Sequence, residues 1–241
     1  MSERGTYLAD LFGGHGGVAR AAEQRDITGR VWDLAAGPRY DLCRRSVRRQ
    51  LCREARRGLL IAACLAPPCS TFSLQQRGAL RALDQPWGKS GLDDRLQSKV
   101  DSGNRTARAA LSLARQFLSL GVSWVLEHPA GSYLWKTPEM QALIDSPHVM
   151  LITIDQCAFR VPWRKSTRLL FGNCDPEDVL GLASHRCKST SKICSFTGKP
   201  HTVLQGSLTA PSQRYPPLLC RRLADVLLGQ AIHRRSITRR N

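Results

Sequence analysis

Short apolar runs alternate with amphipathic segments along this chain, and most of the runs stop at a glycine, a proline or an acidic residue. Continuous apolar runs of this length are typical of strands that are buried on both faces. The alternation predicts an α/β fold with a mostly parallel sheet and helices on both faces. The predicted strands are residues 6–12, 28–34, 59–65, 122–126, 149–154 and 168–171, and the predicted helices are residues 18–24, 42–55, 107–120, 138–144 and 217–232.

The first predicted strand runs into a glycine-rich loop with the sequence DLFGGHGG, residues 10–17. Glycines allow a tight turn and a close approach of the backbone to a ligand, and ligands bind at the carboxyl ends of strands in such sheets. The glycine spacing does not fit the dinucleotide fingerprint. Asp33 and Asp41 follow at predicted strand ends, where a carboxylate either accepts hydrogen bonds from ribose hydroxyls or caps a turn.

Two further strand ends carry reactive side chains. Cys69 follows the strand 59–65 behind Pro67 and Pro68, which would present it rigidly as a nucleophile; the alternative is a small buried cysteine. Glu127 follows the strand 122–126 and is a candidate acid or base if burial raises its pKa; the alternative is an exposed surface carboxylate. His128 is expected to be a packed ring.

The charge of the chain is strongly basic, with 36 Lys and Arg against 19 acidic residues and a formal net charge of +17. Such a field attracts polyanions, so nucleic acid is the first expected partner and an anionic membrane surface the second. Arginines cluster in residues 39–57 and 221–240. The alternative is that these arginines lie on solvated helix faces, which explains each arginine singly but not their large excess over acidic residues. The nine cysteines are irregularly spaced, which favours reduced thiols.

Neither a transmembrane helix nor a signal peptide is expected from the sequence. No run of about 18 apolar residues is present, and the N-terminus lacks the charged-then-apolar layout of a secretory signal. These features favour an intracellular protein, in the cytoplasm of a prokaryote or virus or in the nucleus of a eukaryote. We expect a monomer with no membrane partner.

Taken together and in order, these motifs resemble those of the cytosine-5 DNA methyltransferase family. DLFGGHGG resembles the family's cofactor loop, PPCSTFS (67–73) its nucleophile loop, and LEHP (126–129) its ENV motif. GNRT (103–106) is similar to its helix-opening fifth motif, and FRVPWRKSTRLLF (159–171) to its eighth motif. The final segment, 215–230, resembles the family's closing helix. The resemblance spans residues 6–173 and resumes near 203.

The resemblance implies a compact, divergent S-adenosylmethionine-dependent methyltransferase with a Rossmann-like fold. It implies that Cys69 attacks carbon 6 of a flipped cytosine and that Glu127 bonds ring nitrogen 3. Asp33 would hold the cofactor ribose and Asp41 the adenine amino group. The implied cofactor-binding residues together are Asp10, Phe12, Gly14, Gly16, Asp33, Asp41 and Pro68.

Some positions depart from the family pattern. Ser70 stands where the family has Gln, and His128-Pro129 replaces Asn-Val, where the Asn braces the nucleophile loop. Aligned on Val161-Pro162, Lys165 and Thr167 stand where the family has two arginines, one of which contacts the cytosine carbonyl. Lys165 is our candidate for that contact, with Arg164 and Arg168 as alternatives. A DNA methyltransferase, an RNA (for example tRNA) methyltransferase and a catalytically silent nucleic-acid-binding module all remain open.

We expect a catalytic core over residues 1–173, a small target-recognition insert over 174–208, a returning helix over 209–233 and a basic tail over 234–241. Residues 75–103 are predicted to form a long loop, because they lack a clean periodicity. This loop resembles the family's loop that closes over the target. Its candidate contacts are Arg77, Arg81, Trp87 and Lys89.

The insert offers one possible zinc set, although we assign no metal from the sequence, because its spacings do not match the short-gap pairs of common zinc sites. The alternative is a compact polar loop that touches DNA through its lysines. The zinc set is His185, Cys187, Cys194 and His201, and the lysines are Lys188, Lys192 and Lys199.

Overall fold

The computed structural model describes residues 5–74, 79–189 and 193–238, and within them one sheet has the strand order β2-β1-β3-β4-β6-β5. β1 pairs in parallel with β2 and β3, β3 pairs in parallel with β4, and β6 runs antiparallel to both β4 and β5. The mostly parallel sheet predicted from the sequence is confirmed. The strands are β1 (Tyr7–Leu11), β2 (Thr28–Trp32), β3 (Leu60–Leu65), β4 (Ser123–Pro129), β5 (Val149–Asp155) and β6 (Ser166–Gly172).

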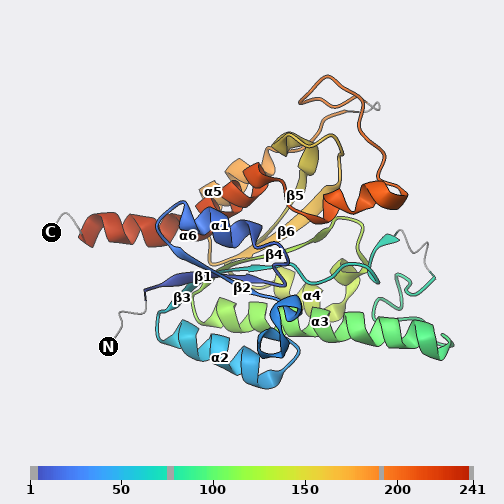
Figure 1. The fold of residues 1–241 in the computed structure, drawn as a ribbon, viewed down its shortest axis with the longest axis horizontal. Helices are drawn as coiled ribbons and strands as arrows, with labels where there is room; N and C mark the ends of the chain where they lie inside the picture. The colour runs from blue at the N-terminus through green and yellow to red at the C-terminus, as the bar shows by residue number, and fades with distance from the viewer. Residues whose placement is uncertain (1–4, 75–78, 190–192, 239–241) are drawn as a thin grey trace.

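Helices cover both faces of the sheet, as Figure 1 shows. One apolar cluster packs α2, α3 and α4 against one face, and a second packs α1, α5 and α6 against the other. This is a Rossmann-like α/β fold, and every residue of β1 is buried at its centre. The helices are α1 (Gly17–Glu23), α2 (Arg45–Arg56), α3 (Asp94–Ser119), α4 (Pro138–Ile144), α5 (Pro176–Ala183) and α6 (Pro217–Thr238).

Helix α3 begins earlier than the sequence predicts. Asp93 caps it by accepting a hydrogen bond from the Leu96 N–H at 2.8 Å, so the loop expected over residues 75–103 ends before Asp94. The first turns are polar and exposed, which hides the helical periodicity. GNRT therefore lies inside α3 and does not open it. Residues 75–78, including the candidate contact Arg77, lie outside the described residues.

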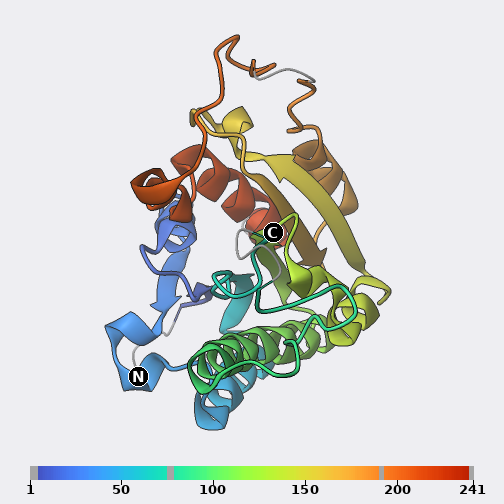
Figure 2. The same ribbon diagram turned by 90° about the vertical axis from the view of Figure 1, so that its right-hand side faces the viewer.

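The expected insert and tail also have more helix than the sequence predicts. Asp175 caps α5 by accepting from the Glu177 N–H at 2.8 Å, and α5 packs on β5 and α6, so it belongs to the core. Helix α6 continues to Thr238, which makes residues 234–238 of the expected tail helical. The irregular residues 184–189 and 193–205 that follow α5 project beyond the sheet (Figure 2); these described residues are called the segment 184–205 from here on.

No helix within the described ranges is both long enough and apolar enough to cross a membrane.

Candidate active site

The glycine loop after β1 is held in place by Asp10. This residue is 3% exposed, and its Oδ2 accepts hydrogen bonds from the N–H groups of Val18 and Ala19, each at 3.1 Å. Burial raises the pKa of Asp10 to about 6, and these two N–H groups oppose the rise. Its carboxylate thus fixes the first turn of α1, which follows the glycine loop. A direct contact between Asp10 and a cofactor stays a prediction.

The loop itself needs glycine at two positions for different reasons. Gly16 has φ +64°, and a Cβ there would lie 2.6 Å from Val31 Cγ2. Gly14 has φ +47°, but a Cβ there would meet no atom within 4 Å, so this part of the loop faces open space. Phe12 also has a positive φ, 57°, and is half-buried. The carboxyl end of β1 thus presents a bare backbone beside an aromatic ring.

Asp33, at the end of β2, is linked to this loop. Its Oδ2 accepts from the Gly14 N–H at 3.0 Å, and its Oδ1 accepts from the Ala35 N–H at 2.9 Å. The capping role considered from the sequence is therefore present, and the carboxylate stays partly exposed. Leu34 beside it is 62% exposed, an apolar surface that sequence reasoning missed.

Asp41 is engaged locally in the same way. Its Oδ1 accepts from the Cys43 N–H at 2.9 Å, and its Oδ2 lies 3.6 Å from Arg44 Nε. It remains partly exposed, so its predicted contact with adenine is neither confirmed nor contradicted.

Cys69 lies in the nucleophile loop, residues 66–74, directly after β3. Its carbonyl accepts hydrogen bonds from the N–H groups of Phe72 and Ser73, both at 3.0 Å, which folds the loop into a turn. The Cys69 side chain is half-buried and Pro68 is exposed. Burial and the charge of Glu127 raise the pKa of the Cys69 thiol, whereas Lys165 opposes this rise.

Arg81 braces the nucleophile loop from inside the protein. It is 1% exposed, and its guanidinium donates to the carbonyl and hydroxyl oxygens of Thr71, each at 2.9 Å. It also donates to Pro86 O at 2.8 Å and lies 3.6 Å over the Phe72 ring. Burial lowers its pKa to about 10. The expectation that Arg81 reaches a target is therefore wrong, because its side chain is buried and its guanidinium donates to oxygen atoms inside the protein.

Trp87 and Gly103, two other residues of the expected closing loop, also make contacts inside the protein. Trp87 donates from Nε1 to Glu139 Oε2 at 2.9 Å, which ties the loop to α4. Gly103 of α3 approaches the nucleophile loop so closely that a Cβ would lie 2.2 Å from Thr71 Oγ1. The glycine of GNRT therefore allows the helix to contact the loop.

The Glu127 carboxyl is buried, and its two oxygens have different surroundings. It is 6% exposed, and its Oε2 accepts a hydrogen bond from Tyr215 Oη at 2.8 Å. Its Oε1 has no hydrogen-bond partner among the residues that the structure describes. Burial raises the pKa of Glu127, opposed by Lys165 and by the bond from Tyr215. The surface-carboxylate alternative is wrong.

His128 is fully buried, as the packed-ring interpretation predicts. Its ring makes edge contacts with Phe72 at 5.9 Å and Trp135 at 6.5 Å between ring centres. Burial, and after it the positive charge of Lys165, lower its pKa to about 3. A neutral imidazole therefore packs under the nucleophile loop.

Lys165 is the basic residue whose charge reaches both Cys69 and Glu127. Its Nζ donates to Ser212 O at 2.8 Å, which joins the loop before β6 to the segment before α6. Arg164, considered as an alternative, instead lies 3.5 Å from Asp155 Oδ1 and donates to Cys187 O at 3.1 Å.

Arg168, the other alternative, lies over the Trp135 ring, 5.9 Å from its centre. Tyr215 is a site residue that the sequence analysis missed. Its position directly before two prolines at the start of the closing helix was the available signal.

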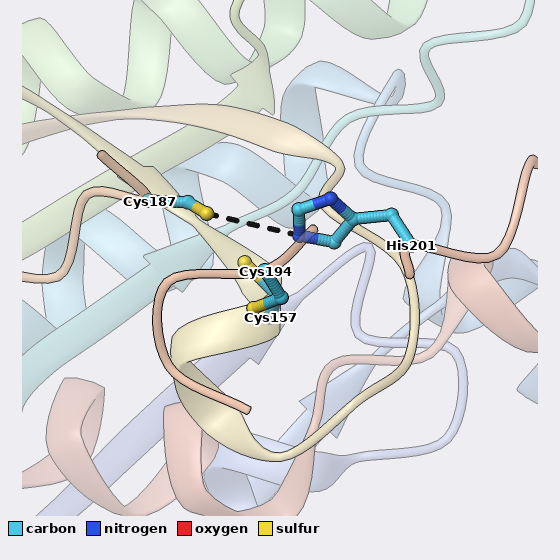
Figure 3. Close-up of side chains that lie close together, drawn as sticks. All are labelled: Cys157, Cys187, Cys194 and His201. Atoms are coloured by element: carbon cyan, nitrogen blue, oxygen red, sulfur yellow. Dashed lines mark hydrogen bonds between the residues drawn. The ribbon is translucent and has the colours of Figure 1, made fainter. Parts of the chain in front are cut away.

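The expected zinc set is corrected by the structure. Cys187, Cys194 and His201 come together, but the fourth side chain is Cys157 rather than His185 (Figure 3). The His185 ring instead stacks on Phe159 with 4.9 Å between centres. Cys157 lies 30 residues before Cys187 in the chain, outside the predicted insert, so spacing alone does not indicate it.

Comparisons with known proteins add little to this geometry. No family model and no curated protein matches the chain. A solved methyltransferase structure from Entamoeba histolytica is similar, with 14% sequence identity and a TM-score of 0.42. The match covers 69% of this chain and 52% of the other, so it spans about half of that protein's length. A likeness at this level carries no argument about activity.

Proposed function

We propose that this protein is an S-adenosylmethionine-dependent cytosine-5 methyltransferase that acts on DNA, with Cys69 as its nucleophile. The observation that carries the proposal is the Glu127 carboxyl. It is buried, one oxygen is held by Tyr215, and the other has no partner in the described structure. A buried polar atom without a partner is costly, so such an atom at a strand end favours a role in binding a ligand.

Glu127 suits the recognition of a cytosine ring. Because burial raises its pKa, the carboxyl is protonated more readily than an exposed one and can donate to ring nitrogen 3. Tyr215 fixes the orientation of the group from the opposite oxygen. A cytosine reaches this position only when it leaves the base stack, at a cost of about a few kcal/mol.

Cys69 and Glu127 are electrostatically coupled in a way that suits covalent catalysis. The charged form of Glu127 raises the pKa of the Cys69 thiol, and Lys165 lowers it. While Glu127 is protonated and donates a hydrogen bond to ring nitrogen 3, it carries no negative charge that would raise the pKa of the Cys69 thiol. Binding of cytosine would therefore favour deprotonation of Cys69, which loses its proton to water.

The proposed reaction proceeds through a covalent adduct between Cys69 and the cytosine. The Cys69 sulfur bonds to carbon 6, and Glu127 delivers a proton to ring nitrogen 3, which makes carbon 5 nucleophilic. S-adenosylmethionine, when bound, would supply the methyl group from its sulfonium sulfur to that carbon and would leave as the neutral thioether. Water removes the carbon-5 proton, and Cys69 leaves as thiolate while nitrogen 3 returns its proton to Glu127.

The residues at the ends of β1 and β2 fit such a cofactor. The loop at Gly14 faces open space, Asp33 keeps a partly exposed carboxylate for hydroxyl groups, and Leu34 offers an exposed apolar surface. Phe12 and Gly16 complete the proposed loop, and Asp41 would contact the adenine.

Charge supports a nucleic-acid substrate. Besides the net charge of +17, helices α2 and α3 form a hollow lined by five arginines, which suits a phosphate backbone. The order of the motifs, which resembles that of DNA methyltransferases, favours DNA over RNA. The five arginines that line the hollow are Arg45, Arg48, Arg49, Arg53 and Arg56.

The test is a methylation assay with labelled S-adenosylmethionine and duplex DNA, single-stranded DNA or a tRNA transcript, scored as 5-methylcytosine. We expect DNA to be methylated, and Cys69→Ser to lower the rate by roughly 10⁴-fold. Cys174→Ser is the matched control, because Cys174 lies after β6 at the opposite end of β4, and its thiol donates to the backbone carbonyls of Trp124 and Gly172.

Duplex DNA with 5-fluorocytosine should form a covalent adduct with the wild-type chain and none with Cys69→Ser. Methylation of tRNA alone would overturn the choice of DNA. Full activity in Cys69→Ser, or binding without methylation of any substrate, would overturn the mechanism.

A further inference from the structure

We propose that Cys157, Cys187, Cys194 and His201 bind one Zn²⁺ ion, which ties the irregular segment 184–205 to the core (Figure 3). The site is separate from the proposed methyl-transfer site. It contains no residue to which the reaction assigns a role.

The distances fit a tetrahedral ion. The four ligand atoms all lie within 4.8 Å of one another, and Cys187 Sγ is 3.7 Å from His201 Nε2. Zinc–sulfur and zinc–nitrogen bonds of about 2.3 and 2.0 Å place tetrahedral ligands roughly 3.5–3.8 Å apart. The longest pair therefore closes by about 1 Å on binding, which side-chain rotation can supply.

The ligands come from separate parts of the chain. Cys157 lies on the 3₁₀ helix Gln156–Phe159, which directly follows β5 in the core. Cys187 follows α5. Cys194 and His201 lie at the two ends of a small turn, closed by a bond from the Cys194 N–H to Lys199 O at 2.8 Å. The three thiols are 1%, 4% and 3% exposed, so the ligands converge in a closed interior.

The surroundings suit a thiolate-rich ion. The N–H and Oγ–H of Ser195 both donate to Cys187 Sγ at 3.4 Å, and such outer bonds orient metal ligands. Three thiolates and a neutral imidazole around Zn²⁺ carry a net charge of −1. Arg164 and Arg186, which both pair with the buried Asp155, provide positive charge next to it.

The segment has almost no apolar core of its own and is joined to the rest of the protein mainly by polar contacts, such as the bond from the Cys187 N–H to Asp155 Oδ2 at 2.8 Å. Within the described part of residues 184–205, only Cys187 and Cys194 are buried, and regular structure is limited to an isolated bridge between Ile193 and Pro200. Phe196 and Val203 are 46% and 64% exposed, so they form no core. Structural zinc supplies folding energy where a core is lacking, and soft thiolate ligands select Zn²⁺ over Mg²⁺ or Ca²⁺.

The test measures metal content of the full chain, expressed with zinc and purified under reducing conditions, by plasma mass spectrometry. We expect about one Zn²⁺ per chain. Cys157→Ser should lose the metal and His185→Gln should keep it, because the structure excludes His185 from the site. Cys174→Ser controls for the loss of a thiol elsewhere.

Two measurements on the wild-type chain do not depend on variants that fold poorly. Replacement of the metal by Co²⁺ should give the intense visible bands of a tetrahedral ion together with thiolate charge-transfer bands. Alkylation should label Cys157, Cys187 and Cys194 only after a chelator is added. Wild-type protein without zinc, zinc retained in Cys157→Ser, or a disulfide among these three cysteines would each overturn the proposal.

Discussion

The nucleophile loop and the segment 184–205 are both irregular, yet they are stabilised by different means. The nucleophile loop places Phe72 in the core at 0% exposure and is braced by the buried guanidinium of Arg81. The described part of the segment 184–205 buries only two cysteines. A loop that must hold a reacting atom is thus supported by core packing and hydrogen bonds. The segment 184–205 instead combines polar contacts with the core, such as the bond from the Thr202 N–H to Pro162 O, with buried cysteines that converge at Cys157.

Apart from the loss of Cys69, the largest effect should come from Glu127, whose charge acts on the Cys69 thiol. Glu127→Gln keeps the shape of the side chain but cannot transfer a proton to ring nitrogen 3, so we expect methylation to fall by about 10²–10³-fold. Because burial raises the pKa of Glu127, wild-type activity should decline as the pH rises through that value. Single-turnover rates across pH measure both effects, and a Glu127→Gln variant with the wild-type pH profile would contradict this role.

Metal removal should separate the two loops. With a chelator, amide hydrogen exchange in residues 187–189 and 193–201 should accelerate by roughly 100-fold, because the bonds that close the segment lose their anchor. Exchange in the nucleophile loop should not change, since Arg81 and Phe72 support it independently. Exchange followed by mass spectrometry resolves both segments, and equal acceleration in the two loops would contradict the comparison.

Arg81 should be the strongest single determinant of the rigidity of the nucleophile loop. Arg81→Lys keeps a positive charge but loses the planar fork that reaches Thr71 and Pro86 together, so we expect about 3 kcal/mol less stability. Urea unfolding measures the loss. Arg95→Lys, an exposed position in α3, is the matched control and should leave the free energy of unfolding unchanged. A similar result for both variants would show that Arg81 does not brace the loop.

The sheet can be predicted from the sequence because the apolar signal of a buried strand is local. Cys69 and Glu127 are predicted for the same reason, since each directly follows such a strand. Arg81 is misassigned because a buried guanidinium with neutral partners looks, in sequence, like any arginine of a polar loop. Cys157 is missed because a ligand contributed from the core is identified only by the fold.

Substitution of His128 should have the smallest of these effects, a change in how folding stability depends on pH. Burial lowers its pKa to about 3, so the folded protein binds fewer protons than the unfolded chain between about pH 3 and 6.5. Its contribution to stability is therefore complete above pH 6.5 and is lost as the pH falls, by about 2 kcal/mol at pH 5. Asp10, with a pKa raised to about 6, acts in the opposite direction between about pH 4 and 6.

The difference between wild type and His128→Asn isolates the histidine, because Asp10 contributes equally to both proteins. Urea unfolding at pH 7 and pH 5 should show the variant losing about 2 kcal/mol less than the wild type on acidification. A wild type with the same loss as the variant would mean that the ring is charged in the folded protein. A charged ring would contradict the interpretation that a neutral imidazole packs under the nucleophile loop. It would also contradict the conclusion that core packing supports this loop.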